Sequence, residues 1–358
     1  MAQQAAEKAY FHLPGLFEFY SFYEAFLPVW QEHREYFHDW CDIGSIYGAP
    51  ADCTWGGGRV ENGAAKPAEV LALLKTYGIS GRLTFSNSLL KNAHLRNKAC
   101  NELCRLFSES SRERSAKKSV AVADSDGAPE SGSAKVAGTG EQSEPLTVPA
   151  PASVDGAVAG HEAGDGRIRN GVIVHSDLLL KYIKEHYPDL YVVSSTTKVL
   201  TEFADLKKEL EREEFRYVVP DFRLNKHFDE LSQLPQEEKD KVEFLCNECC
   251  SFYCKDRKAC YESVSRKNLG IDGPEHHCRA RGSNTGYRFS TAMANPGFIS
   301  ADHIHRVYMP MGFSNFKIEG RSLGSALLLE FVLYYMTKPE YQIHVREALY
   351  LDNMLDLF

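Results

Sequence analysis

The sequence lacks an apolar run long enough to cross a membrane. Its longest apolar stretch, SALLLEFVLYYM, is short and contains Glu330, whereas a membrane helix needs about 20 mostly apolar residues. The opening residues, MAQQAAEKAYFHLPG, lack the basic segment followed by an apolar segment that marks a secretory signal. We therefore expect a cytoplasmic protein without a membrane partner, whose thiols stay reduced.

Motifs of several common enzyme classes are also missing. There is no Gly-x-Ser-x-Gly elbow and no Cys–His pair in a recognisable protease context. A net charge of −8 argues against a general nucleic-acid coat protein, although a local basic groove is compatible with it. With 43% hydrophobic and 25% charged residues, the composition is that of a globular protein with a sizeable core.

Cysteine, by contrast, is concentrated in one region. Six of the ten cysteines lie between positions 246 and 278, in LCNECCSFYCKDRKACYE and the later HHC. Clustered thiols in such a polar segment are typical of a soft metal ion or an iron–sulfur cluster. Zinc ribbons usually have two C-x₂-C pairs, and this region has one, Cys246–Cys249, followed by C-x₃-C. A structural zinc knot, or buried thiols without a metal, are the alternatives to iron.

Short apolar segments alternate with amphipathic helices along most of the chain. Seven segments are nearly continuously apolar, which is typical of buried parallel strands. They are 42–48, 82–87, 171–176, 190–197, 216–222, 242–248 and 316–320. We expect an eighth strand within 286–290 or 296–300. Repeated βα units in this number predict a single α/β domain over 1–358, a (β/α)₈ TIM-type barrel, with an open doubly wound sheet as the alternative.

Two segments fall outside this alternation. Residues 108–168 contain no Phe, Trp or Tyr and are rich in Ser, Ala, Gly, Pro and Glu. Such a segment buries too little apolar surface to offset its ordering entropy, so we expect a disordered insertion. The aromatic residues 11–30, FHLPGLFEFYSFYEAFLPVW, are expected to form a packing helix or a barrel plug rather than a substrate lid.

Polar side chains collect at the ends of the predicted strands, where TIM-type barrels place their catalytic groups. Glu248, beside the thiols, would act as an acid or base if burial raised its pKa. Arg223, oriented by Asp221, would hold a substrate carboxylate through two parallel hydrogen bonds. Arg321 beside Glu319 would bind a carboxylate or phosphate in the same way. In both places a structural ion pair is the alternative.

A glycine-rich loop, Trp55 followed by GGG and Arg59, comes after the strand predicted at 42–48. Glycines let backbone amides approach an anion closely, and Arg59 could pair with a phosphate or carboxylate. The loop does not complete a P-loop or dinucleotide fingerprint. A flexible loop with a tight turn is the simpler interpretation.

Several of these pieces resemble the collagenase-like peptidase superfamily, namely NECCSFYC, ACYESVSRKNLG, ISADHIHRVYMPMG and FKIEGR. That group also includes iron–sulfur proteins for oxygen-independent hydroxylation of ubiquinone precursors, transfer RNA and ribosomal RNA. The resemblance covers most of the chain outside the insertion and is strongest over 242–321. It implies a TIM-type barrel and, in the hydroxylation members, a [4Fe–4S] cluster held by four cysteines.

The resemblance also implies which cysteines bind the cluster. Cys250 and Cys254 match the C-x₃-C of the family motif, and Cys278 looks like its later cysteine. Cys53 follows the pattern in which a cysteine after the first strand joins the set. Cys260 is the local alternative for the fourth ligand.

The sequence thus predicts an iron–sulfur enzyme, or enzyme subunit, that hydroxylates or otherwise modifies RNA or a small aromatic metabolite. Arg59, Arg223 and Arg321 would hold the anionic substrate or a second protein subunit. One alternative is a collagenase-like peptidase that uses a metal-bound water with Glu248 or Glu319 as the base. The other is a non-catalytic scaffold whose loop is folded by zinc.

Overall fold

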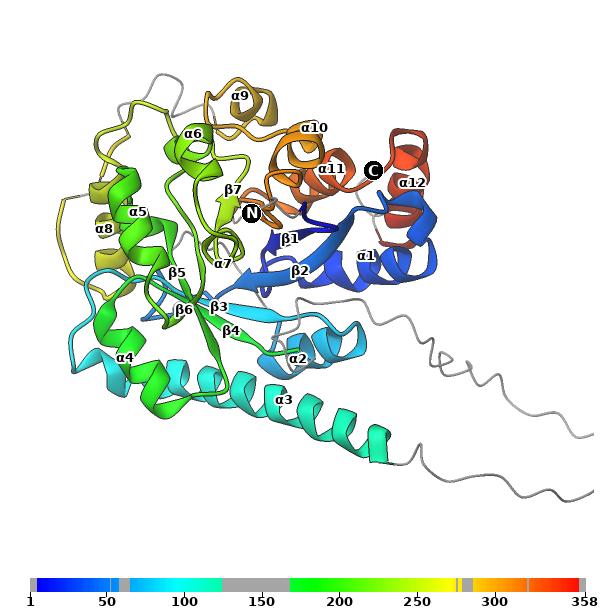
Figure 1. Cartoon of the computed structure of the whole chain (residues 1–358). Helices are drawn as coiled ribbons and strands as arrows, with labels where there is room; N and C mark the ends of the chain where they lie inside the picture. The colour runs from blue at the N-terminus through cyan, green and yellow to red at the C-terminus, as the bar shows by residue number, and fades with distance from the viewer. Residues whose placement is uncertain are drawn as a thin grey trace, which may run out of the picture.

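Eight parallel strands form one curved sheet in the computed structural model of the chain (Figure 1). The structure describes residues 5–51, 53–57, 65–123, 168–274, 276–278, 286–320 and 322–353. The strands are β1 Ala9–Pro14, β2 Cys41–Gly48, β3 Gly81–Phe85, β4 Gly171–Val174, β5 Tyr191–Ser194, β6 Phe215–Val218, β7 Glu243–Leu245 and β8 Asn315–Lys317.

The strand order is β6-β5-β4-β3-β2-β1-β8-β7, and every pairing in the sheet is parallel. The two edge strands approach each other through an isolated parallel bridge between Val218 and Val242. There the Val218 N–H donates to the carbonyl oxygen of Lys241 at 2.8 Å. The sheet is therefore a nearly closed barrel, which confirms the predicted TIM-type fold.

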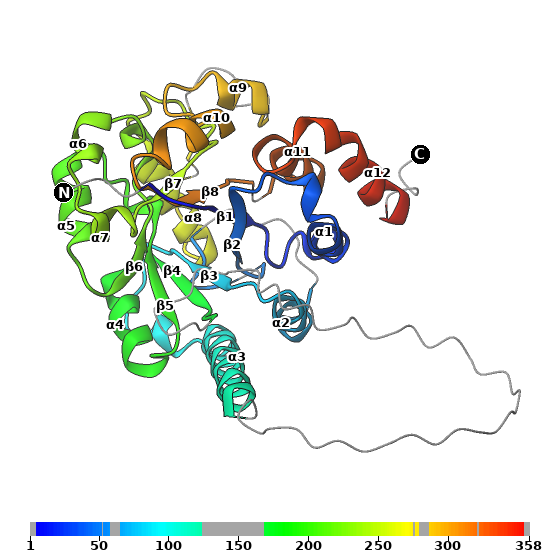
Figure 2. The same cartoon turned by 45° about the vertical axis from the view of Figure 1, so that its right-hand side comes forward.

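Helices surround the barrel and separate successive strands. They are α1 Tyr20–Glu32, α2 Pro67–Thr76, α3 Lys98–Ala123, α4 Asp177–His186, α5 Phe203–Leu210, α6 Phe228–Ser232, α7 Gln236–Lys239, α8 Arg257–Asn268, α9 Phe289–Met293, α10 Ala301–His303, α11 Ser325–Tyr335 and α12 Gln342–Asn353. Figure 2 shows α1, α11 and α12 gathered on the side of the barrel next to β1 and β2. Among the described residues, no helix has the length and apolar character needed to cross a membrane.

The first strand lies where the sequence analysis expected a packing helix or a plug. Phe11 and Leu13 of β1 are buried, as is His12 between them. The His12 ring lies 2.9 Å from Ser45 Oγ through Nδ1 and 3.3 Å from Asn315 Oδ1 through Nε2. β1 therefore pairs with β2 and β8, and the helix in this segment starts later, at Tyr20.

The expected eighth strand within 286–290 or 296–300 is wrong. Phe289–Met293 forms the short helix α9, and residues 296–300 form a turn and an extended segment without strand pairing. Phe289 packs its ring against Phe331 and Tyr334 of α11. Its aromatic character thus serves helix packing outside the sheet.

The insertion begins later than residue 108. Helix α3 continues to Ala123, and Ser108 and Ser111 are buried. The Asn170 N–H donates to Ser111 Oγ at 2.9 Å, which ties α3 to the residue before β4. The remaining part of the predicted segment, 124–167, lies outside the described residues.

Charged side chains occupy the interior of the barrel. Glu243 at the start of β7 forms ion pairs with Arg82 of β3 and with Lys317 of β8, the latter at 3.0 Å. Burial would raise the pKa of Glu243, but these cations hold it far below its ordinary value. Burial lowers the pKa of His12, which stays neutral 3.6 Å from the same carboxylate. This network fixes the relative positions of four strands around one buried carboxylate.

Candidate functional site

The predicted acidic residues lie at the carboxyl ends of three neighbouring strands. Asp221 follows β6, Glu248 follows β7 and Glu319 follows β8. Asn247 links the last two ends, because its Nδ2 donates to the Glu319 carbonyl at 2.9 Å and its Oδ1 accepts from the Glu319 N–H at 2.7 Å. The barrel therefore brings these carboxyl groups to the end where this fold places catalytic chemistry.

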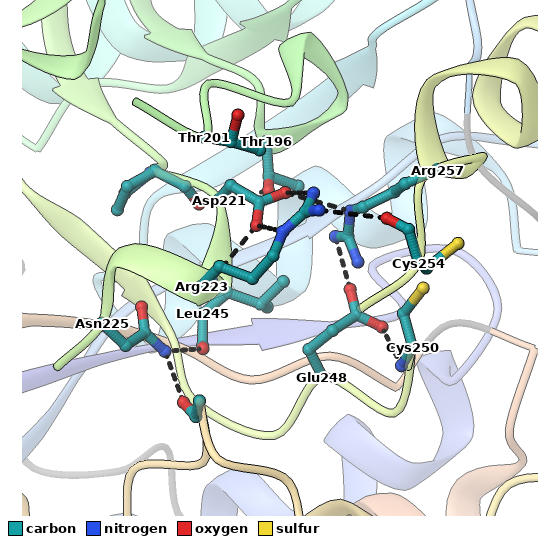
Figure 3. Close-up of polar contacts among 12 residues, drawn as sticks. Thr196, Thr201, Asp221, Arg223, Asn225, Leu245, Glu248, Cys250, Cys254 and Arg257 are labelled. Carbon is teal, nitrogen blue, oxygen red and sulfur yellow. Dashed lines mark hydrogen bonds and ion pairs between the residues drawn. The ribbon is translucent and has the colours of Figure 1, made fainter. Parts of the chain in front are cut away.

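An arginine that the sequence analysis did not assign holds Glu248. Nη2 of Arg257, the first residue of α8, lies 2.5 Å from Glu248 Oε2, and the Cys250 N–H donates to Oε1 at 2.9 Å (Figure 3). The guanidinium group also lies 4.8 Å from the Phe222 ring and 5.3 Å from the Tyr261 ring, distances typical of cation–π contacts. Glu248 and Arg257 are only 5% and 4% exposed, so this ion pair is buried and fixed by its surroundings.

Asp221 and Arg223 form a second ion pair beside the first. Arg223 donates to Asp221 through Nε at 2.6 Å and through Nη2 at 2.9 Å, and its Nη1 donates to the Cys254 carbonyl at 3.0 Å (Figure 3). Arg257 Nε is 3.4 Å from the same carboxylate. This geometry is that of the structural ion pair considered from the sequence, and a substrate-binding role for Arg223 stays a prediction.

Glu248 and Glu319 form a carboxyl pair at the barrel mouth. The two side chains share a hydrogen bond, and two adjacent carboxyl groups rarely ionise together. Burial would raise the pKa of Glu248, but Arg257, the Cys250 amide and Glu319 together hold it below its ordinary value. The pKa is thus lowered, opposite to the rise considered from the sequence. Glu248 is the buried member of the pair and is favoured in its ionised form, whereas Glu319 is partly exposed.

Two of the predicted metal ligands lie together next to this pair. Figure 3 places the sulfur atoms of Cys250 and Cys254 near each other and close to Arg257. Burial raises the pKa of Cys250 to about 12. Arg257 opposes this rise, and Glu248 adds to it. Without a metal Cys250 is therefore a neutral thiol, and binding a metal would require its deprotonation.

The other predicted ligands have different surroundings. Cys53 Sγ lies 3.5 Å from the Sγ of Cys100 in α3. Cys260 is half-buried in the first turn of α8, and Cys278 is exposed. Across the part of the chain that the structure describes, no three His, Cys, Asp or Glu side chains form a group suited to a metal ion. Because the described residues show no such group, we assign no reaction step to a metal, and the [4Fe–4S] or zinc centre stays a prediction.

Two of the predicted anion-binding arginines cannot be placed. Arg59 and Arg321 lie outside the described residues. The loop before Arg59 is described as far as Gly57, where a Cβ atom would come within 2.1 Å of the Ser86 carbonyl oxygen. This glycine therefore serves close packing of the loop on the end of β3.

The sequence analysis did not assign Arg257 and Tyr261, which the structure places beside Glu248, or Cys100, which lies against Cys53. The polar run after β7 contains Arg257, but nothing in its spacing shows that the side chain turns back to Glu248. A glutamate that is buried at a strand end requires a cation beside it. This requirement was the signal in the sequence that pointed to a partner such as Arg257.

Comparisons with known proteins give little further information. No family model matches this chain, and no curated protein matches it. A solved structure that does match is described as "The Structure of the U32 Peptidase Mk0906". Its TM-score is 0.40 at 13% sequence identity, and the match covers 78% of this chain and 85% of that chain. A likeness this distant carries no information about activity.

Proposed function

We propose that this chain is a hydrolase of peptide bonds in which Glu319 is the catalytic acid–base group and Glu248 positions it. One observation carries the proposal: the hydrogen bond between the two carboxyl groups, with Glu248 held ionised by Arg257. Pairs of carboxyl groups whose surroundings favour opposite protonation states are typical of acid–base catalysis at neutral pH. The resemblance of the sequence to collagenase-like peptidases supplies the substrate class.

In this proposal the protonated Glu319 gives its proton to the leaving amine. The carboxyl pair takes up a proton from the attacking water, so that the pair again holds one proton after the amide bond is broken. Glu319 is the member closer to solvent, because the residue is partly exposed whereas Glu248 is buried, although the Glu319 Oε2 atom is itself buried. The Tyr287 hydroxyl, which donates to the Asn247 carbonyl at 3.2 Å, borders the pair and is also partly exposed.

The test is cleavage of a mixed peptide library by the purified full chain, followed by mass spectrometry. Glu319→Gln keeps the side-chain shape and removes the transferable proton, so cleavage should fall by about 10²–10⁴-fold. Glu330→Gln, at the exposed ion pair with Arg346, is the matched control. Cleavage that survives in Glu319→Gln at the rate of the control would exclude this role.

A metal-dependent function is a second candidate, supported by the adjacent Cys250 and Cys254 thiols. It would be the modification or hydroxylation of RNA or a small aromatic, anionic metabolite, with a second protein subunit as a further expected partner. Purification without oxygen, followed by an absorption spectrum and iron analysis, tests it. An iron–sulfur cluster should give an absorption band at about 400 nm, and this band should be lost in Cys250→Ser. A colourless, iron-free protein would remove this candidate and leave the carboxyl-pair proposal untouched.

A further inference from the structure

Two cysteines distant in the sequence face each other beside the barrel. Cys53 follows β2 and Cys100 lies in the first turn of α3, and their Sγ atoms are 3.5 Å apart. Both residues are buried, with Cys53 at 9% exposure and Cys100 at 1%. A disulfide has an S–S length of about 2.05 Å, so the sulfurs need to approach by a small movement to bond.

The surroundings of Cys100 favour its thiolate. The Cys53 sulfur lies within hydrogen-bond distance of the Cys100 sulfur, which also accepts hydrogen bonds from the backbone amides of Trp55 and Thr54. Hydrogen bonds that point at a sulfur favour its charged form. The Cys100 N–H in turn donates to Asn97 Oδ1 at 3.0 Å, which caps this start of a long helix, and helix starts stabilise negative charge. The pair thus consists of a nucleophile, Cys100, and a proton-bearing neighbour, Cys53.

The loop that carries Cys53 is held firmly against α3. Asn97 Nδ2 donates to Thr54 Oγ1 at 2.9 Å, and Asn87 Nδ2 donates to the Thr54 carbonyl at 3.2 Å. Trp55 Nε1 donates to the His94 carbonyl at 2.8 Å. Because the loop is anchored on both sides, the two sulfurs are kept facing each other in the reduced protein.

A third cysteine on the same helix provides an internal comparison. Cys104 lies one turn beyond Cys100 and is fully buried. Burial raises the pKa of Cys104 well above its ordinary value, and Cys100 adds to that effect. A thiol in such surroundings is unreactive, so Cys104 shares the helix but lacks the features that favour reaction at Cys100.

We propose that Cys53 and Cys100 are a redox-active pair that a small peroxide converts into a disulfide. The Cys100 thiolate attacks one peroxide oxygen, the O–O bond breaks, and hydroxide leaves, so that Cys100 becomes a sulfenic acid. The hydroxide takes up the proton that the Cys100 thiol had released and becomes the first water. Cys53 gives up its proton and attacks the Cys100 sulfur, which releases a second water. Two thiols are oxidised by two electrons, and one hydrogen peroxide is reduced to two waters.

The experiment treats the native full chain with hydrogen peroxide, alkylates the remaining thiols after denaturation, and maps the peptides by mass spectrometry. A cross-linked peptide containing Cys53 and Cys100 should appear, and a reducing phosphine should remove it. Cys53→Ser should abolish the cross-link and leave Cys100 as a sulfenic acid that a cyclic diketone labels. Cys104→Ser should form the cross-link as the unsubstituted chain does.

Two outcomes would overturn the proposal. One is full alkylation of both Cys53 and Cys100 in the peroxide-treated, unsubstituted chain, a measurement that does not depend on whether a variant folds. The other is a cross-link that joins Cys100 to Cys104 or is lost equally in Cys104→Ser. Neither outcome bears on peptide cleavage by the carboxyl pair, which is measured on the reduced protein.

Discussion

Arg257 lies against the carboxyl groups of two different strand ends, and its Nη2 is 2.5 Å from Glu248 Oε2. Because Arg257 opens α8 and Glu248 follows β7, this contact fixes the N-terminal end of the helix on the barrel. The other end is fixed by Asn268, whose Nδ2 donates to the Gly56 carbonyl at 2.7 Å. Helix α8 is therefore attached at both ends by polar contacts.

Arg257→Ala should destabilise the protein by roughly 3–5 kcal/mol, because it leaves the Glu248 carboxylate buried without its cation. Urea unfolding followed by circular dichroism measures this. The control is Arg266→Ala on the same helix, whose side chain donates at the surface to the Pro274 carbonyl and should change stability by about 0.5 kcal/mol at most. Equal effects of the two substitutions would show that the ion pair adds nothing.

The lowered pKa of Glu248 predicts a contribution to acid sensitivity. A carboxyl group whose pKa is lower in the folded state stabilises the fold above its ordinary pKa, here near 4.5, and this stability is lost as the pH falls through the lower folded value. The free energy of unfolding should therefore fall more steeply with acid in the unsubstituted chain than in Glu248→Gln. Parallel pH curves for the two proteins would contradict the assignment.

Glu319→Gln should separate activity from stability. The amide still donates a hydrogen bond to Glu248, so the melting temperature should stay close to that of the unsubstituted chain, while peptide cleavage falls by about 10²–10⁴-fold. Thermal unfolding and cleavage rates measured on one preparation test both parts. A variant that loses stability and activity together would indicate a structural role for Glu319.

Glu243→Gln should be among the most damaging single changes in the barrel interior. It removes the carboxylate that pairs with Arg82 and Lys317, and an unpaired buried charge costs roughly 3–5 kcal/mol. Chemical unfolding measures the loss, with Glu214→Gln at a more exposed position as the control. A difference between the two variants of less than about 1 kcal/mol would be inconsistent with the buried network.

Gly57→Ala should disturb the loop that carries Cys53, because the added Cβ would meet the Ser86 carbonyl oxygen at 2.1 Å. We expect a loss of roughly 1–3 kcal/mol, typical of forced overpacking. Gly273→Ala is the control, since the nearest atoms there belong to the Arg266 side chain at 3.4 Å. Unchanged stability of Gly57→Ala would mean that the loop relaxes away from β3.

Most of the barrel follows from patterns that a single sequence displays. Buried parallel strands are mostly apolar, and seven nearly continuous runs showed that pattern even where a single charge such as Glu243 or Lys317 points into the barrel. The strand β1 was missed because a long aromatic helix follows it closely, so that its short run looks like part of that helix. Its stability depends on Ser45 and Asn315, which reach it from β2 and β8, and no local pattern reveals such partners.

The site could be predicted only in part for the same reason. Strand ends correctly placed Asp221, Glu248 and Glu319 at one end of the barrel. Cys100 could not be foreseen as the neighbour of Cys53, because their contact depends on how α3 packs against a distant loop. The boundary at 108 was wrong for a different reason. A composition poor in apolar residues predicts disorder, yet helix α3 continues through the buried Ser108 and Ser111 to Ala123.

The bridge between Val218 and Val242 makes the wall between β6 and β7 the least reinforced joint of the barrel among the described strands. Arg257 spans that joint from above, with Asp221 on one side and Glu248 on the other. Separating the two strands would therefore also break the contacts of the guanidinium group that keeps Glu248 ionised. The closure of the barrel and the charge of Glu248 thus depend on the same side chain.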